Sequence, residues 1–173
     1  MHIVLFLLLA ILGLAAGMAY TSTQMQAGLG TTLAINTGTP STPTWVTIGE
    51  VKSIKQSGRV TKTDDATNLQ TTGDEEFIGV IRTPGKYDVS VNRITTDTGQ
   101  AAVLSAFNSV PPVTVQFKAT LLKAAGQVTT GDAYVFSCII EECDDLETIE
   151  PTKGIQSKYG LKVSGTIVKT SGS

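Results

Sequence analysis

Histidine is almost absent from this chain. Of the 173 residues only His2 is one, and it lies in an apolar N-terminal run. The rest of the sequence therefore has no side chain for a Ser-His-Asp triad, a histidine general base or a histidine zinc ligand. Cysteine is also scarce: Cys138 and Cys143 lie five positions apart, and such a pair supports neither a zinc site nor a disulfide framework. We expect both thiols to be reduced in a protein assembled in the cytosol, with a local disulfide as the alternative.

Aromatic residues and net charge are low as well. Aromatics make up 6% of the chain, and Trp45 is the single tryptophan. A glycosidase needs only two carboxylates, but sugar sites are usually lined by aromatic rings, so hydrolysis is disfavoured. The pair Gly28 and Gly30 lacks the third glycine of a dinucleotide site, because Leu33 stands at that position. A net charge of −2 gives no long-range attraction to nucleic acid or acidic membrane. We therefore expect no catalytic residue, no cofactor and no bound metal.

The first residues form an apolar leader. Positions 3–16 hold only apolar residues and glycine, a length typical of a signal-peptide core, and an extension to Tyr20 would reach the lower limit of a membrane anchor. Signal peptides normally begin with Lys or Arg, and neither precedes this run. We favour a leader, residues 1–17, that is spurious or not native, in front of a start at Met18. A cleaved signal and an anchor remain the alternatives.

The composition that is present favours strands and turns, since Thr, Val, Ser and Gly are abundant. Residues 18–44 are rich in Gly and Pro, which predicts a flexible, turn-rich arm interrupted by a short strand at 32–36. Residues 45–173 are predicted to form one domain. Apolar residues at alternate positions, or in short runs, predict strands at 45–57, 77–81, 87–92, 113–121, 134–140 and 161–167. Residues 45–54 and 77–92 are expected to pair around an intervening loop.

One helix is predicted. Asp97 and Gln100 have the spacing of a capping box, and apolar residues at helical intervals follow up to Asn108, before Pro111-Pro112. The whole pattern predicts a mainly β protein: an antiparallel β-sandwich or barrel-like fold with one short flanking α-helix and long loops.

Charged residues gather in two segments. Residues 58–75 are polar and are predicted to form an 18-residue loop, which is long for a compact domain and often functional. Residues 141–150 are predicted to be a solvated acidic loop rather than a calcium site, because the spacing matches no EF-hand. We interpret the basic residues of 52–62 as solvated or as partners for salt bridges between subunits, rather than as phosphate ligands. Trp45 is interpreted as a core or interface residue rather than a ligand platform.

Taken in order, these segments resemble the tail tube proteins of long, flexible-tailed bacteriophages. The resemblance spans roughly residues 18–170. It rests on Trp45, Ile-Gly-Glu-Val at 48–51, the charged loop with Asp-Ala-Thr-Asn-Leu-Gln at 65–70, Phe-Ile-Gly-Val-Ile at 77–81, the strand at 87–92, Asp-Thr-Gly-Gln at 97–100 and Val-Ser-Gly at 163–165. One turn departs from the family pattern: Arg-Thr-Pro-Gly at 82–85 stands where the family usually has Asp-Xaa-Gly.

The resemblance implies subunits that form hexameric rings, which stack into a hollow tube through which DNA passes without sequence-specific binding. It also implies that other tail proteins, such as the tape measure and the terminator, are partners. The mature protein would belong to the virion tail, would be assembled in the bacterial host cytoplasm and would contact no membrane. If residues 1–17 are a true signal, the alternative is a secreted or membrane-anchored β-sandwich binding module.

Acidic side chains in the lumen of such a tube would repel DNA phosphates and let the genome slide. We hypothesise that carboxylates within 64–76 or 141–150 face that lumen. The candidate assembly or lumen residues are Trp45, Glu50, Lys52, Arg59, Lys62, Asp64, Asp65, Asp74, Glu75, Glu141, Glu142, Asp144 and Asp145.

Overall fold

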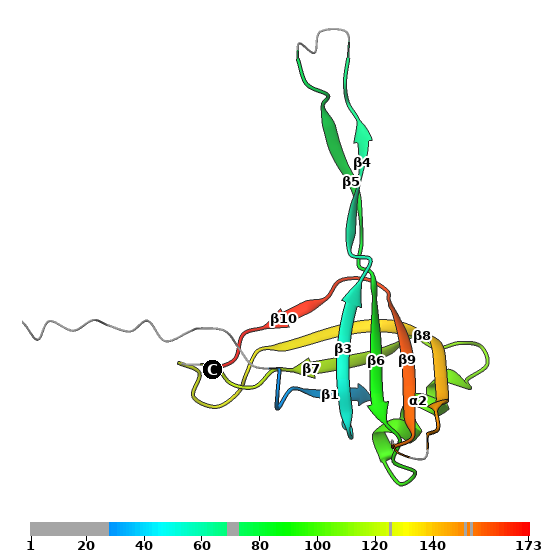
Figure 1. Ribbon diagram of the computed structural model, residues 1–173. Helices are drawn as coiled ribbons and strands as arrows, with labels where there is room; N and C mark the ends of the chain where they lie inside the picture. The colour runs from blue at the N-terminus through cyan, green and yellow to red at the C-terminus, as the bar shows by residue number, and fades with distance from the viewer. Residues whose placement is uncertain (1–27, 69–72, 125, 151, 153) are drawn as a thin grey trace, which may run out of the picture.

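The computed structural model describes residues 28–68, 73–124, 126–150, 152 and 154–173 (Figure 1). The leader 1–17 and the first part of the predicted arm, 18–27, lie outside the described residues. The elements, in chain order, are β1 (Thr32–Asn36), β2 (Trp45–Ile48), β3 (Val51–Ser57), β4 (Val60–Asp65), β5 (Phe77–Thr83), β6 (Lys86–Asn92), α2 (Thr98–Phe107), β7 (Val115–Thr120), β8 (Ala133–Thr148), β9 (Gln156–Val163) and β10 (Val168–Thr170).

The main body is one eight-stranded sheet. Seven of its strands follow the order β2-β1-β7-β8-β9-β6-β3, and the eighth, β10, pairs with β8. Every pair in it is antiparallel. The order has two ends, β2 and β3, so the sheet is not closed into a barrel. The strands β4 and β5 form a separate two-stranded sheet. The prediction of a mainly antiparallel β fold with one short flanking helix is confirmed over the described residues.

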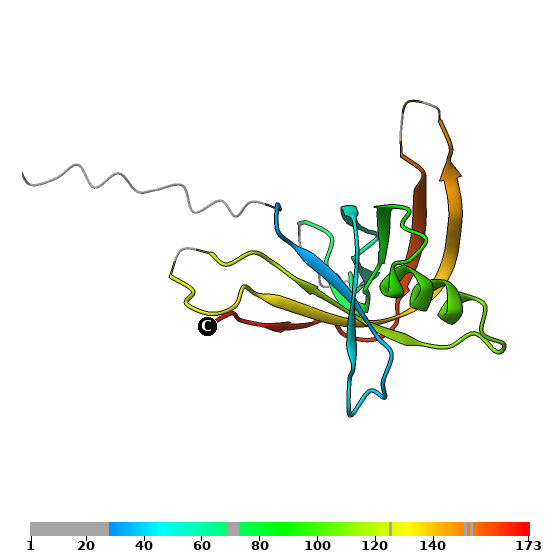
Figure 2. The same ribbon diagram turned by 90° about the horizontal axis from the view of Figure 1, so that it is seen from below.

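The core lies on one face of the curved sheet, against which α2 packs through β1, β2 and β8 (Figure 2). Val103 of the helix is fully buried there. Alternate residues of the strands point into this core because successive side chains of a strand lie on opposite faces. The largest of the buried side chains are Leu33, Ile35, Phe117, Phe136, Tyr159 and Leu161.

Strand β1 belongs to the body of the protein. It lies inside the range 18–44, for which the sequence predicts an arm with one short strand, and it pairs with β2 on one side and β7 on the other. Leu33 and Ile35 are 0% and 1% exposed. The sheet therefore begins inside the range for which the sequence predicts a flexible arm.

The single strand predicted at 45–57 is wrong, because the structure contains two strands there. Gly49 and Glu50 form a turn between β2 and β3, and Glu50 has a left-handed backbone with φ of 55°. The two strands then lie at opposite ends of the sheet order. Alternation in the sequence does not show this break, since the apolar period resumes after the turn.

The 18-residue loop predicted at 58–75 is also wrong. Residues 60–65 are β4, which pairs with β5 in the register Val60↔Thr83 to Asp65↔Phe77. Every residue of both strands is exposed, so β4 has no buried face and shows no apolar alternation. The expected pairing around this segment holds only in part: β3 pairs with β6, while β5 pairs with β4.

The acidic segment 141–150 is not a solvated loop. Strand β8 continues to Thr148 and pairs with β9 through Cys143↔Tyr159 and Asp144↔Lys158. Asp144 is the register partner of Lys158. Two lysines of β9, Lys158 and Lys162, form ion pairs with Glu142 and Glu141. That cross-strand charge pairing accounts for a strand with so many acidic residues.

Candidate assembly surface

The hairpin formed by β4 and β5 stands away from the main sheet (Figure 1). The two strands hydrogen-bond to each other and to no other strand of the described chain. Five apolar side chains of the hairpin are 56–64% exposed: Val60, Phe77, Ile78, Val80 and Ile81. Apolar side chains gathered on a projecting element mark a contact surface, because water disfavours their exposure.

Two glycines lie where the hairpin leaves the sheet. Gly58 and Gly85 have φ of 68° and 85°, a left-handed conformation that L side chains rarely adopt. They lie across from each other between the last pair of the main sheet, Ser57↔Lys86, and the first pair of the hairpin, Val60↔Thr83. A Cβ at Gly85 would overlap the carbonyl oxygen of Ser57. The chain can make this joint because both positions are glycine.

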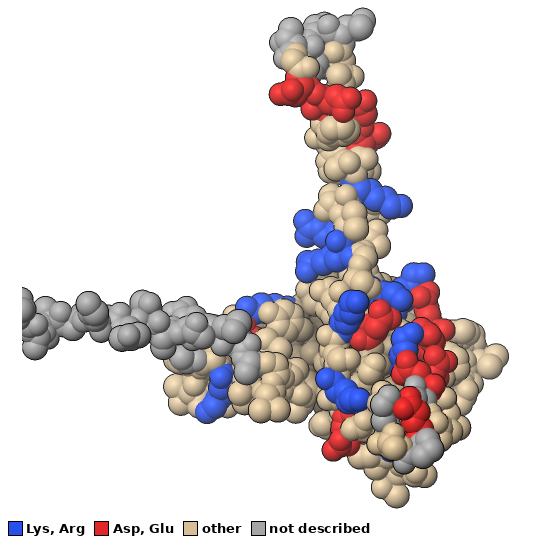
Figure 3. All heavy atoms as spheres, in the orientation of Figure 1, with Lys and Arg blue, Asp and Glu red and all other residues tan. Residues whose placement is uncertain are grey.

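Charge is divided along the hairpin. The basic candidates Arg59 and Lys62 lie near its base with Arg82, while the acidic candidates Asp64, Asp65, Asp74 and Glu75 lie toward its outer end (Figure 3). The pKa of Asp65 is lowered by hydrogen bonds from Thr67, whose backbone N–H donates to Asp65 Oδ1 over 2.8 Å. The Asp65 carboxylate is therefore ionised at neutral pH.

The second acidic set has basic partners. Glu141 Oε1 lies 2.7 Å from Lys162 Nζ, and Glu142 Oε1 lies 3.1 Å from Lys158 Nζ. The hydrogen bond to Glu142 raises the pKa of Lys158. Asp145 Oδ1 lies 3.1 Å from Arg93 Nε. These ion pairs are partly exposed, so each stabilises the fold only slightly. They do offset the negative charge of three carboxylates for which the sequence does not indicate a partner.

The remaining candidates have local roles in the structure. The ring of Trp45, on the edge strand β2, is partly buried, and Lys118 Nζ lies 4.8 Å from its centroid. Glu50 Oε2 accepts a hydrogen bond from Asn92 Nδ2 at 3.1 Å, within the turn that joins β2 and β3. Lys52 is exposed on β3, the other edge strand. The structure thus places the candidates in several regions and not in one pocket.

Cys138 and Cys143 are free thiols in the structure. Burial raises the pKa of Cys138 to about 12, and burial together with Asp145 and Asp144 raises that of Cys143 to about 11. Both are protonated at neutral pH and therefore weak nucleophiles. Within the described residues no group of His, Cys, Asp and Glu is arranged to hold a metal ion. In the same part of the chain, no helix has the length and apolarity needed to cross a membrane.

Sequence reasoning missed the exposed apolar residues of β5. A run such as Phe77–Ile81 is typical of a strand covered on both faces, so the sequence predicts a strand of the main sheet there. The polar sequence of its partner β4 was the signal that this hairpin has no core face. The sequence predicts Gln100 only as part of a helix cap, whereas the structure also buries its side-chain amide.

No family model matches this chain, and no curated protein matches it. Solved structures do. The SPP1 tail tube aligns with a TM-score of 0.61 and 14% identity over 86% of this chain and 80% of that one. The sheath-tube complex of PVC, an extracellular contractile injection system, aligns with a TM-score of 0.63 and 6% identity over 87% and 94%.

A third structure, the tail of an empty GTA particle with C6 symmetry, aligns with a TM-score of 0.58 and 15% identity over 80% of this chain and 96% of that one. These neighbours are structural proteins of tubes and not enzymes. Identities this low show a shared fold and nothing finer. The chain has the tail tube fold, which phage tails and contractile injection systems share.

Proposed function

We propose that this protein is the structural subunit of the tail tube of a long, flexible-tailed bacteriophage. Copies of it form hexameric rings, and the rings stack into a hollow conduit for DNA. The observation that carries this proposal is the β4–β5 hairpin, which projects from the main sheet and exposes five apolar side chains in the described structure. The tail tube fold supports it.

The energetics of the hairpin favour a partner. A two-stranded hairpin is marginally stable in water by itself, because each strand has one neighbour and no core. Burial of apolar area contributes about 25 cal/mol per Å², so contact with another copy would stabilise the hairpin and the assembly together. The β2 and β3 edges offer unpaired backbone groups, through which a heterologous contact can close into a ring.

The proposal places the protein in the virion tail after assembly in the host cytoplasm. Its partners are copies of itself and the proteins that complete a tail, such as the tape measure and the terminator. DNA passes through the conduit without sequence-specific binding, and the mature protein contacts no membrane. Neighbours with this fold were solved in a tail with C6 symmetry and in a baseplate symmetrised six-fold, which supports the hexameric ring.

The direct test is electron microscopy of the purified protein over a range of concentrations. Hollow tubes or six-fold rings are expected. A protein that stays monomeric at high concentration, by sedimentation velocity as well, would contradict the proposal.

A hairpin variant tests the observation behind it. Phe77→Ser with Ile81→Thr removes apolar area from side chains that are already 59% and 61% exposed, so the free energy of unfolding should change by less than about 1 kcal/mol. Assembly should be lost, because the apolar contact is lost. The matched control is Val128→Thr, an exposed apolar residue outside the hairpin, which should assemble like the wild type.

A further inference from the structure

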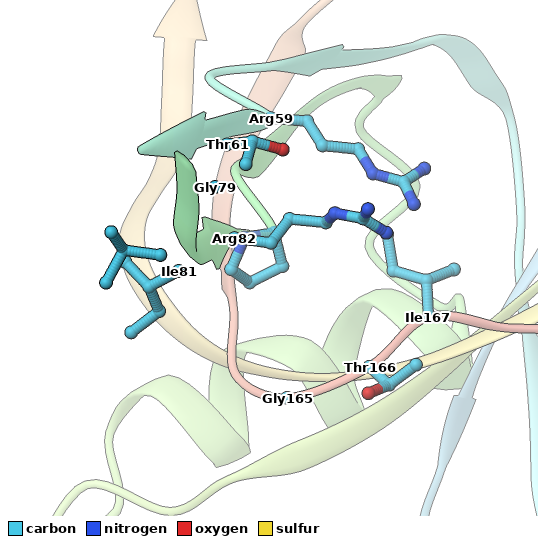
Figure 4. A pocket seen from close by; sticks show the side chains of 10 residues that line it. Arg59, Thr61, Gly79, Ile81, Arg82, Gly165, Thr166 and Ile167 are labelled. Atoms are coloured by element: carbon cyan, nitrogen blue, oxygen red, sulfur yellow. The ribbon is translucent and has the colours of Figure 1, made fainter. Parts of the chain in front are cut away.

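A cleft of about 550 Å³ lies at the base of the hairpin, between β4–β5 and the turn that joins β9 to β10. Arg59, Thr61 and Arg82 line it on the hairpin side, and Gly165 and Ile167 on the other (Figure 4). Both arginine side chains extend into the same space (Figure 4).

Strand geometry puts the two arginines together. Thr61 is the register partner of Arg82, and Arg59 lies two positions before Thr61. Arg59 lies just before β4 begins at Val60, and it lines the same cleft as Thr61 and Arg82, so the two guanidinium groups share one side of the hairpin (Figure 4). A slip of one residue in register would separate them.

The cleft has cations but no anion. Neither Arg59 nor Arg82 forms an ion pair with another described residue, and no acidic side chain lines the cleft. A guanidinium presents a planar set of N–H donors that matches a carboxylate in two parallel hydrogen bonds. Two of them beside apolar side chains such as Ile167 therefore suit an acidic segment that also carries apolar residues.

The chain contains such a segment at the outer end of the same hairpin. Asp64, Asp65, Asp74 and Glu75 are exposed there without an ion pair in the described structure, and Phe77 and Ile78 beside them are exposed as well. The blue base and red outer end are separate in Figure 3. The two ends of the hairpin are complementary in charge.

This contact cannot form within one copy. Five residues of extended strand separate Arg59 from Asp64, which amounts to about 17 Å at roughly 3.3 Å per residue. The strands are paired along that length, so the outer end cannot fold back to the base. The acidic end of one hairpin can therefore reach such a cleft only on another copy of the chain.

We propose that the cleft formed by Arg59 and Arg82 receives the acidic outer end of the hairpin of a neighbouring copy. This inference rests on the proposed self-assembly and specifies its contact. Charge complementarity then sets which end of one hairpin meets which part of the next.

Charge exchange tests the contact. The cleft variant is Arg59→Glu with Arg82→Glu, and the end variant replaces Asp64, Asp65, Asp74 and Glu75 by Lys. Each alone should raise the critical concentration of assembly by at least about tenfold, because like charges then meet at the contact. An equimolar mixture should assemble, since each variant supplies the complement of the other. A single chain with all six substitutions should also assemble.

Two controls exclude general charge effects. Lys123→Glu makes the same change as Arg82→Glu at an exposed site outside the cleft and should leave the critical concentration unchanged. A variant with Lys at Glu141, Glu142, Asp144 and Glu147 has as much added positive charge as the end variant, yet should not restore assembly of the cleft variant. Circular dichroism should show that every variant is folded.

The outcomes separate this inference from the proposed function. Assembly of the cleft variant at the wild-type concentration would overturn the contact and leave the tube proposal intact. If neither the mixture nor the chain with all six substitutions assembles, the proposed pairing of these two sites is overturned. Binding of duplex DNA to the wild-type monomer that is lost in the cleft variant, with normal assembly of the end variant, would assign the cleft to phosphate instead. Failure of the wild type to assemble would refute the proposed function itself.

Discussion

At the scale of single residues, the buried amide of Gln100 joins three parts of the fold. Its Nε2 donates to Gly49 O at 3.1 Å and to Asn92 O at 2.9 Å, and its Oε1 accepts from Ile94 N at 3.0 Å. The side chain is fully buried, so water cannot replace these bonds. The turn after β2, the end of β6 and the start of α2 are therefore held together by one side chain.

Gln100→Ala should lower the free energy of unfolding by about 3 kcal/mol, because it leaves buried backbone groups without partners. Urea denaturation of the monomer measures this. Ser105→Ala, an exposed change on the same helix, should stay within about 0.5 kcal/mol of the wild type. Equal stability of the two variants would contradict the role of the amide.

Asp132 holds the C-terminal strand in place through three contacts. Its Oδ1 accepts from Gly172 N at 2.9 Å and from Gln127 Nε2 at 2.7 Å, and its Oδ2 lies 2.7 Å from Lys169 Nζ. The hydrogen bond from Gly172, followed by that from Lys169, lowers the pKa of Asp132 from 3.8 to about 2.

The lowered pKa sets the sign of a pH effect. Because the folded pKa lies below the unfolded one, the stabilisation is complete above about pH 4 and is lost as the pH falls through about 2. Amide protection of β10, corrected for intrinsic exchange rates, should fall over that window. In Asp132→Asn it should be lower already at pH 5 and should not change across the window. Protection in the wild type that stays constant from pH 4 to 2 would refute the prediction.

At the scale of elements, the joint at Gly58 and Gly85 sets the direction of the hairpin. Both glycines have left-handed backbones, but their surroundings differ. An added Cβ at Gly58 would meet only the Cα of Gly85 at 3.8 Å, whereas at Gly85 it would overlap backbone atoms of the opposite strand. Alanine at Gly58 and alanine at Gly85 can therefore be compared directly, because the backbone conformation is similar and only the surroundings differ.

Gly85→Ala should destabilise the protein by more than about 2 kcal/mol, because steric overlap adds to backbone strain. Gly58→Ala should cost about 1 kcal/mol, from the left-handed conformation alone. Urea denaturation compares the two, and assembly assays should show the larger defect for Gly85→Ala. A larger effect at Gly58 would show that the joint has a different geometry.

At the scale of the whole molecule, we expect different roles for the carboxylates of the hairpin and for those of residues 141–150. If the hairpin carboxylates occupy the cleft of a neighbour, the carboxylates of residues 141–150 remain as the candidates that face the lumen. Glu141 and Glu142 are offset by lysines there, which leaves Asp144 and Glu147 as the carboxylates without an ion pair in the described structure.

Asp144→Asn with Glu147→Gln should therefore leave tube formation intact and slow genome ejection, because fewer charges would repel the DNA. Ejection from assembled particles at several salt concentrations measures this. The matched variant, Asp64→Asn with Asp65→Asn, should weaken assembly instead. No effect from either pair would refute the lumen hypothesis.

Local signals in the sequence were sufficient for the helix. Asp97 Oδ1 accepts from Gln100 N at 2.7 Å, as the capping spacing predicts, and α2 ends at Phe107, one residue before the predicted end. Strand β7 and the first half of β8 also follow their apolar alternation. In each case the residues that determine the element lie within it.

Non-local contacts decided the rest. The sequence by itself determined that the described part of the chain is a mainly antiparallel β protein with a capped helix, because composition and short-range periodicity carry that information. Only the tertiary structure showed that β2 and β3 separate at Glu50, that β4 and β5 form an uncovered hairpin, and that Arg59 and Arg82 share a cleft. The physical reason is that strand pairing and burial join residues far apart in the chain, and no local pattern encodes the partner.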